Sequence, residues 1–163
     1  MKVENYSGWQ LPVLVILRVA IGWHFLYEGI TKLINPNWSS LGYLMDSKGL
    51  FSGLFHSMAG NPTMLSILDF LNIWGLIFIG AGLIVGLFTK AASISGMVLL
   101  GFYYLSHPAL IGVNYAIPSE GNYLWINKNL LEFLALWVVV LFPTWKEVGI
   151  DRFIFRTNQE KEQ

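Results

Sequence analysis

Apolar residues in this chain are gathered into four long runs that are separated by more polar turns. The runs cover Leu11 to Ile34, Met64 to Phe88, Ala91 to Leu105 and Tyr123 to Phe142. A helix needs about 17–25 mainly apolar residues to cross the hydrocarbon core of a bilayer. The runs are continuous rather than alternating, which excludes the pattern of a membrane β-barrel. The pattern therefore predicts four transmembrane helices, of which the third is the shortest and ends by Pro108.

Asparagine and proline residues mark the expected ends of these helices. Asn61-Pro62 has the pattern of an N-cap followed by a first helical residue. Asn35-Pro36 resembles another helix start, and Pro143 is expected to end the fourth helix.

The segment between the first two runs carries a second kind of pattern. Its apolar positions are Leu50, Phe51, Leu54, Phe55 and Met58. This spacing is typical of an amphipathic helix that lies in the membrane interface. Gly49 separates it from a shorter apolar piece, so we expect a flat helical cap over the outer mouth of the bundle. The tail from Thr144 to Arg156, with Trp145, Val148, Phe153 and Ile154, is predicted to be a second interfacial segment, on the inner side.

Composition supports a membrane protein and excludes several kinds of chemistry. Of the 163 residues 55% are hydrophobic and only 12% are charged, whereas a globular protein has about 25% charged residues. Ten basic and ten acidic residues cancel, so no basic field indicates nucleic-acid binding. The lack of cysteine excludes thiol catalysis, disulfides, Cys-ligated iron–sulfur clusters and c-type haem attachment. We expect an all-α integral membrane four-helix bundle with an interfacial helical cap in the first loop, forming one domain over residues 1–156, followed by a polar tail at 157–163.

The distribution of Lys and Arg predicts the orientation of the chain, because basic flanks stay on the cytoplasmic side. One side of the bundle carries Lys2, Lys90, Lys146, Arg152, Arg156 and Lys161. The other side carries Lys32, Lys48 and Lys128. Six residues against three place both termini in the cytoplasm.

The apolar runs are interrupted by ionisable and polar residues. On the first predicted helix, Arg18, His24, Glu28 and Lys32 fall within an arc of about 120°. The later helices add Asp69, Asn72, Tyr103, Tyr104, His107, Lys128, Asn129 and Glu132. A charge at mid-membrane costs about 2.5–3.5 kcal/mol, so such residues face the bundle interior and pair, with Glu28 and Lys32 as the obvious pair. In the predicted topology all except Arg18 lie in the outer half, so we expect them to converge on one pocket beneath the cap.

This constellation has two interpretations. It is either a buried ionic network that fixes helix register or a binding site for a polar-headed, lipid-soluble ligand such as a quinone, which enters sideways from the bilayer. For the second interpretation the candidate catalytic residues are Glu28, His24 and Glu132. The candidate ligand-binding residues are Arg18, Lys32, Asp69, Tyr103, His107, Lys128 and Asn129. For Arg18, which lies nearer the inner surface, we favour a structural role.

Two further cofactor sites would use the same residues. His24 and His107 could serve as axial ligands of a b-type haem, but hydrogen-bonded histidines in a polar cluster are the favoured interpretation. A metal set of His24, Glu28 and Glu132 is opposed by the nearby lysine, and we expect no metal.

Four stretches resemble the DoxX/DoxD family. The run from Leu17 to Leu33 has the form Leu-Arg-x-x-x-Gly-x-x-Phe-x-x-x-Gly-x-x-Lys-Leu, which is similar to the first helix of that family. The others are Gly82-Leu-Ile-Val-Gly86-Leu-Phe-Thr-Lys90-Ala-Ala, Asn127-Lys128-Asn129-x-x-Glu132 and Gly149-Ile-Asp151. The resemblance implies a four-helix protein of a bacterial-type inner membrane. DoxD members are described as the small, quinone-linked subunit of a thiosulfate:quinone oxidoreductase, which implies a partner redox subunit.

The leading hypothesis is therefore a membrane subunit of a quinone-linked oxidoreductase. His24, Glu28 and Glu132 would exchange protons with a quinone head, and Lys32, Tyr103 and Asn129 would hydrogen-bond its carbonyls. The quinone would be held without a covalent bond, and the expected surroundings are the lipid bilayer and the partner subunit, with oligomerisation left open. The alternative is a non-enzymatic membrane anchor or assembly scaffold for a partner complex.

Overall fold

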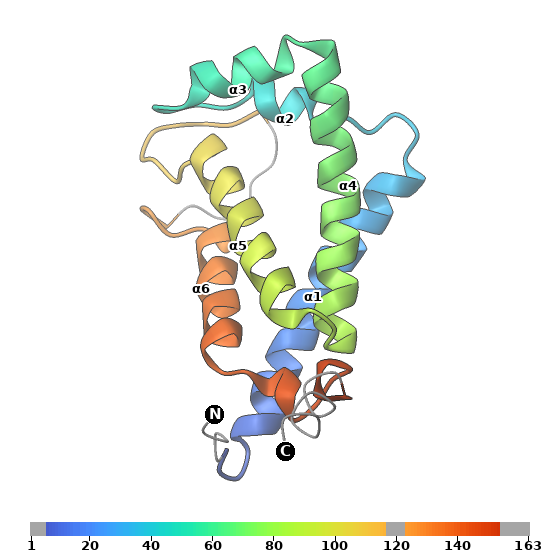
Figure 1. Ribbon diagram of the computed structural model, residues 1–163. Coiled ribbons are helices and arrows are strands. Elements are labelled where there is room, and N and C mark those ends of the chain that lie inside the picture. The colour runs from blue at the N-terminus through green and yellow to red at the C-terminus, as the bar shows by residue number, and fades with distance from the viewer. Residues whose placement is uncertain (1–5, 117–122, 154–163) are drawn as a thin grey trace.

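The computed structural model describes residues 6–116 and 123–153, and in these ranges the regular structure is helical (Figure 1). The α-helices are α1 (Gln10–Ile34), α2 (Leu41–Met45), α3 (Ser52–Ala59), α4 (Pro62–Val85), α5 (Thr89–Ser106) and α6 (Lys128–Leu141), and a short 3-10 helix, η1 (Thr144–Lys146), follows. Three of the four predicted long helices begin and end within a few residues of their expected bounds. The fourth, α6, begins five residues later than predicted, because Tyr123–Ile126 forms a tight turn in which Leu124 and Trp125 have positive φ.

Helices α1 and α4 pack against each other over the largest interhelical contact, and α5 with α6 forms the second pair. The α1–α4 contact is close because Gly22 and Gly29 of α1 lie against the backbone or Cβ atoms of α4. Gly80 of α4 lies directly against the backbone of α1 at Gly22 and Leu26. Small residues permit this approach of two membrane helices.

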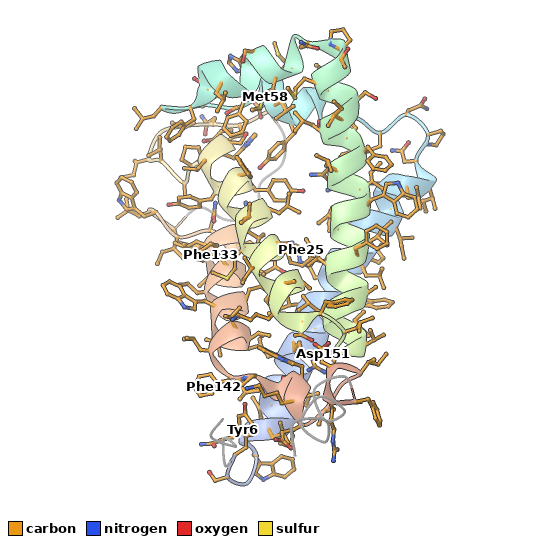
Figure 2. The ribbon with its side chains drawn as sticks, in the orientation of Figure 1. Tyr6, Phe25, Met58, Phe133, Phe142 and Asp151 are labelled. Carbon is orange, nitrogen blue, oxygen red and sulfur yellow. The ribbon has the colours of Figure 1, made fainter. Side chains whose placement is uncertain are left out.

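The hydrophobic core lies between the two helix pairs. It contains Ile21, Phe25, Leu76, Ile79, Leu83, Ala92, Leu100, Leu136, Val139 and Trp145. These residues come from α1, α4, α5, α6 and η1, so all four long helices bury side chains in one cluster. Phe25, labelled near the centre of Figure 2, is 2% exposed. The core therefore holds the four long helices together in the lower and middle part of the molecule, and the cap covers the upper part.

The cap consists of α2 and α3, which lie across the upper end of α4 and α5 (Figure 1). Gly49, with φ +104°, lies between the two helices as expected. The predicted helix start at Asn35-Pro36 is wrong. Helix α2 instead begins after Ser40, whose backbone N–H and hydroxyl both donate to Asp69 Oδ1, at 2.8 and 2.5 Å.

Side chains cap the starts of α4 and α5, and the sequence predicted the first of these caps. Asn61 accepts from the backbone N–H groups of Thr63 and Met64, and Pro62 is the first residue of α4, so this predicted N-cap is confirmed. The buried carboxylate of Asp151 accepts from the backbone N–H groups of Phe88 and Thr89, at 2.8 and 3.0 Å, at the start of α5. A carboxylate here also interacts favourably with the helix dipole.

The segment after α6 differs from the expected interfacial tail. Trp145 is 4% exposed and belongs to the core, because Arg18 holds the segment against the bundle. The guanidinium of Arg18 donates to Thr144 Oγ1 at 3.2 Å and to the carbonyl of Val148 at 2.9 Å. Phe153 is exposed, whereas the predicted residues Ile154 and Arg156 lie outside the described residues.

Two described helices, α1 and α4, are long and apolar enough to cross a membrane. Both carry many exposed apolar side chains, among them Trp23 and Tyr27 on α1 and Phe70 and Phe78 on α4. Such a surface is unfavourable in water and is typical of contact with lipid.

Candidate functional site

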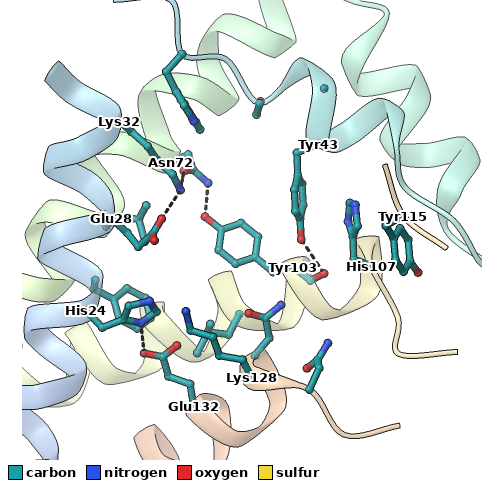
Figure 3. A pocket seen from close by; sticks show the side chains of 18 of the residues that line it. His24, Glu28, Lys32, Tyr43, Asn72, Tyr103, His107, Tyr115, Lys128 and Glu132 are labelled. Carbon is teal, nitrogen blue, oxygen red and sulfur yellow. Dashed lines mark hydrogen bonds and ion pairs between the residues drawn. The ribbon is translucent and has the colours of Figure 1, made fainter. Parts of the chain in front are cut away.

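A cavity of about 500 Å³ lies between the two helix pairs, directly beneath the cap (Figure 3). Its walls come from α1, α4, α5 and α6, and its roof comes from α2, the loop that precedes α2 and the loop that follows α5. Phe25, Leu76 and Leu100 provide apolar wall, and the rest of the lining is mainly polar or aromatic. A partly apolar cavity with a few convergent polar groups is the usual form of a small-molecule site.

Eight of the ten predicted site residues line this cavity. They are His24, Glu28, Lys32, Tyr103, His107, Lys128, Asn129 and Glu132. Arg18 and Asp69, which were predicted as ligand-binding residues, do not line it. Arg18 is 2% exposed, lies in the N-terminal half of α1 and holds the segment after α6, whereas Asp69 accepts from Ser40 and orients the start of α2.

His24 and Glu132 form a close pair that joins α1 to α6. His24 Nδ1 lies 2.6 Å from Glu132 Oε1 (Figure 3). The other polar atoms of the pair, His24 Nε2 and Glu132 Oε2, are buried and have no hydrogen-bond partner among the described residues. The sequence placed both residues in the pocket but did not pair them, because the contact depends on how α1 and α6 are rotated.

A second set of polar groups joins α1, α4 and α5. Lys32 Nζ lies 3.7 Å from the carboxylate of Glu28, so the predicted i,i+4 pair is present. Lys32 also donates to Asn72 Oδ1 at 3.1 Å, and Asn72 Nδ2 donates to the hydroxyl of Tyr103 at 2.6 Å. The ammonium group lies 5.2 Å from the ring centroid of Trp38, where a cation–π interaction stabilises it.

The roof of the cavity is a stack of aromatic rings. The ring of His107 stacks on that of Tyr43 with centroids 3.9 Å apart, and the centroid of the Tyr115 ring lies 4.5 Å from that of His107. Burial lowers the pKa of His107, an effect that Asp46, 3.8 Å from Nε2, partly opposes. Burial likewise raises the pKa of Tyr43, so its hydroxyl stays protonated and donates to the carbonyl of Tyr103.

Several polar and aromatic lining residues were given no role in the site by the sequence analysis. Asn72 was expected to converge on the pocket with the other polar residues, and it does line the cavity, but no role was assigned to it. Trp38 and Tyr43 belong to the shorter apolar piece before Gly49, which was expected only as part of the cap, and Tyr115 lies in a loop without any periodic signal.

The donors of the cavity are arranged for hydrogen bonding. Within residues 6–116 and 123–153, no three His, Asp or Glu side chains are grouped as in a metal site. The polar groups include the pair of His24 with Glu132 and a chain that runs from Glu28 and Lys32 through Asn72 to Tyr103. Such groups can orient the polar head of a bound molecule and exchange protons with it.

Comparison with known proteins gives one match. The family model described as DoxX matches residues 13–108, which is more than half of the chain. No curated protein and no solved structure matches. The matched stretch includes α1, the cap, α4 and α5, whereas the resembling motifs at residues 127–132 and 149–151 lie beyond it. On this match, and with two helices able to cross a bilayer, the chain belongs to the DoxX family and is an integral membrane protein.

Proposed function

We propose that the chain is a membrane subunit of a quinone-linked oxidoreductase and that its cavity binds the polar head of a lipid-soluble ligand such as a quinone. The observation that carries the proposal is the convergence of two separate polar sets on one cavity of about 500 Å³. A buried network with a purely structural role would satisfy its own polar atoms. His24 Nε2 and Glu132 Oε2 are left without partners among the described residues, which favours a ligand.

The proposal includes a four-helix arrangement in the bilayer. Helices α5 and α6, with 18 and 14 residues, extend about 27 and 21 Å along their axes. Their outward-facing apolar side chains include Val98, Phe102, Leu131, Leu134, Trp137 and Leu141, all exposed. We infer that these faces contact lipid, as those of α1 and α4 do. The Lys and Arg bias would then place both termini on the cytoplasmic side of a bacterial-type inner membrane, with the cap outside.

The exposure of the lining residues suggests how a ligand enters. The side chain of Glu28 is 44% exposed and that of His24 is 33% exposed, both on α1, and Lys128 is exposed at the start of α6. The contact between α1 and α6 is the weakest among the adjacent long helices. We infer that the cavity opens between α1 and α6, so that a head group passes in from the bilayer while its tail stays in lipid.

The alternative is an anchor or scaffold for a partner complex, and one surface favours it. The turn of Tyr123–Ile126 presents four exposed apolar side chains, and Leu124 and Trp125 adopt a positive φ that such residues rarely take. Two hydrogen bonds hold the turn in place, from Tyr104 Oη to the carbonyl of Trp125 and from Trp125 N to the carbonyl of Ala109. This rigid apolar turn would suit contact with a subunit of the partner complex.

Native mass spectrometry of the protein, gently solubilised from its own membranes, tests the proposal. A bound mass matching a quinone is expected on the unchanged chain, and it should be lost from Glu132→Gln, which removes the charge of the His24–Glu132 pair at constant size. Exposed Trp137→Phe on the same helix serves as the control and should retain the mass. A chain that never carries such a mass, and that instead copurifies with a second polypeptide, would favour the scaffold.

A further inference from the structure

We infer that the cavity selects the hydroxyl-bearing, reduced form of its ligand, a hydroquinone or another 4-substituted phenol, and that His24 Nε2 accepts the hydroxyl proton. The inference rests on the proposed function and specifies which chemical form of the head group the cavity prefers. It depends on the direction of each hydrogen bond in the two polar sets, which can be worked out atom by atom.

The first polar set, the His24–Glu132 pair, presents hydrogen-bond acceptors to the cavity. With one proton on the His24–Glu132 pair, that proton lies between Nδ1 and Oε1, which are 2.6 Å apart. A neutral imidazole that donates through one nitrogen accepts through the other, and an ionised carboxylate only accepts. His24 Nε2 and Glu132 Oε2 are thus both acceptors, and both are buried without partners in the part of the chain that the structure describes.

The second polar set, the chain from Lys32 through Asn72 to Tyr103, presents a hydrogen-bond donor to the cavity. A lysine ammonium can only donate, so the amide oxygen of Asn72 faces Lys32 and the amide nitrogen faces Tyr103. The oxygen of Tyr103 therefore accepts from Asn72, at 2.6 Å, and its own proton is directed elsewhere. Because Tyr103 lines the cavity, this proton is available to an acceptor on the ligand.

A hydroquinone matches this polarity and a quinone does not. One hydroxyl of a hydroquinone donates to His24 Nε2, and the opposite oxygen accepts from Tyr103. A quinone has two carbonyl oxygens, both acceptors, so one of them would face the acceptors of the His24–Glu132 pair. Sites built to bond a hydroxyl discriminate strongly against analogues that lack it, because the buried polar atoms are left unpaired.

The same geometry allows one balanced proton transfer. His24 Nε2 takes the hydroxyl proton, and the resulting imidazolium is paired with the carboxylate of Glu132 at the Nδ1–Oε1 contact. The negative charge remains on the ligand oxygen, and no electron moves in this step. Lys32 and Lys128, which both line the cavity, favour a negative charge there.

The test compares ligands of one shape on the full chain in lipid nanodiscs under anaerobic conditions. The probes are a decyl-substituted benzohydroquinone, the matching quinone and the hydroquinone dimethyl ether, each titrated to equilibrium. The hydroquinone is expected to bind at least about 10-fold more tightly than either of the others. His24→Phe should remove this preference, whereas the matched control Tyr27→Phe, on the exposed face of α1, should keep it.

The outcomes separate the inference from the proposed function. Equal affinity for all three probes, or tighter binding of the quinone, overturns the selectivity and leaves the quinone site standing. Binding of none of the probes overturns the proposed function itself. The dimethyl ether keeps the inference falsifiable even where His24→Phe does not fold, because that comparison uses the unchanged chain.

Discussion

Replacing Gly80 with alanine perturbs the contact between α1 and α4, on which the position of His24 depends. A Cβ atom at residue 80 would lie 2.4 Å from the backbone nitrogen of Leu26 and 2.6 Å from the carbonyl oxygen of Gly22, whereas ordinary contacts begin at 3.4 Å. Both neighbours are backbone atoms and cannot rotate away. The two helices must therefore separate by about 1 Å, and overpacking of this kind costs about 1–3 kcal/mol.

The same helix provides a control at Gly75, where an added Cβ meets nothing within 4 Å. Alanine is a better helix former than glycine by about 0.8–1 kcal/mol, so Gly75→Ala should leave stability unchanged or raise it. The assay is thermal or detergent-induced unfolding of each variant in micelles, followed by circular dichroism. If Gly80→Ala were as stable as Gly75→Ala, the close backbone contact between α1 and α4 would be wrong.

Two further predictions concern the ends of α5. Asp151→Asn replaces a buried carboxylate that accepts from the backbone at Phe88 and Thr89, so unfolding should become about 1.5–3 kcal/mol easier in the same assay; an unchanged midpoint would contradict the cap. At the other end, burial lowers the pKa of His107 below its ordinary value of 6.5, so the unfolded chain binds the proton more tightly. The folded chain should therefore have its full stability above pH 6.5. Its free energy of unfolding should decrease as the pH falls from 6.5 toward the lower pKa that His107 has in the folded chain. His107→Phe, which keeps a ring against Tyr43, should reduce this pH dependence, and an equal slope in both proteins would contradict the assignment.

Much of the site could be predicted because helical periodicity is a local property. His24, Glu28 and Lys32 lie on one stripe of α1, and the cost of a charge in lipid directs such a stripe inward. The pairing of His24 with Glu132 was not predictable in the same way. It depends on the rotation of α6 about its axis, which is set by packing between residues more than a hundred positions apart.

The glycine positions likewise show that contacts between helices cannot be predicted from a local sequence pattern. The Gly82-x-x-x-Gly86 spacing is typical of close-packing positions in membrane helices, and Gly75 is a further small residue on the same helix. Gly75 faces open space, and Gly86 ends α4 in a left-handed conformation, with φ +69°. The closest approach is at Gly80, which no spacing rule had singled out, because a glycine's neighbours come from another helix.

The position of Trp145 shows how a residue far away in the sequence determines where the segment after α6 packs. Its surroundings in sequence are typical of an interfacial tail, and aromatic residues are common at that level of a membrane. The hydrogen bonds from Arg18 to Thr144 and Val148 instead draw the segment into the core. The role of Arg18 thus follows from residues about 130 positions away, which a single-helix pattern does not contain.

In the proposed function a quinone head binds in the cavity between α1 and α6 and not merely at the lipid-facing surface. Photoaffinity labelling tests it most directly, with an azido-quinone that carries a lipid tail, the full chain in nanodiscs, and the labelled residues mapped by mass spectrometry. We expect labels on cavity residues such as Tyr103 and Glu132, and we expect excess decyl-substituted hydroquinone to suppress them. Labels confined to exposed side chains such as Phe78 or Trp137, unaffected by the competitor, would contradict it.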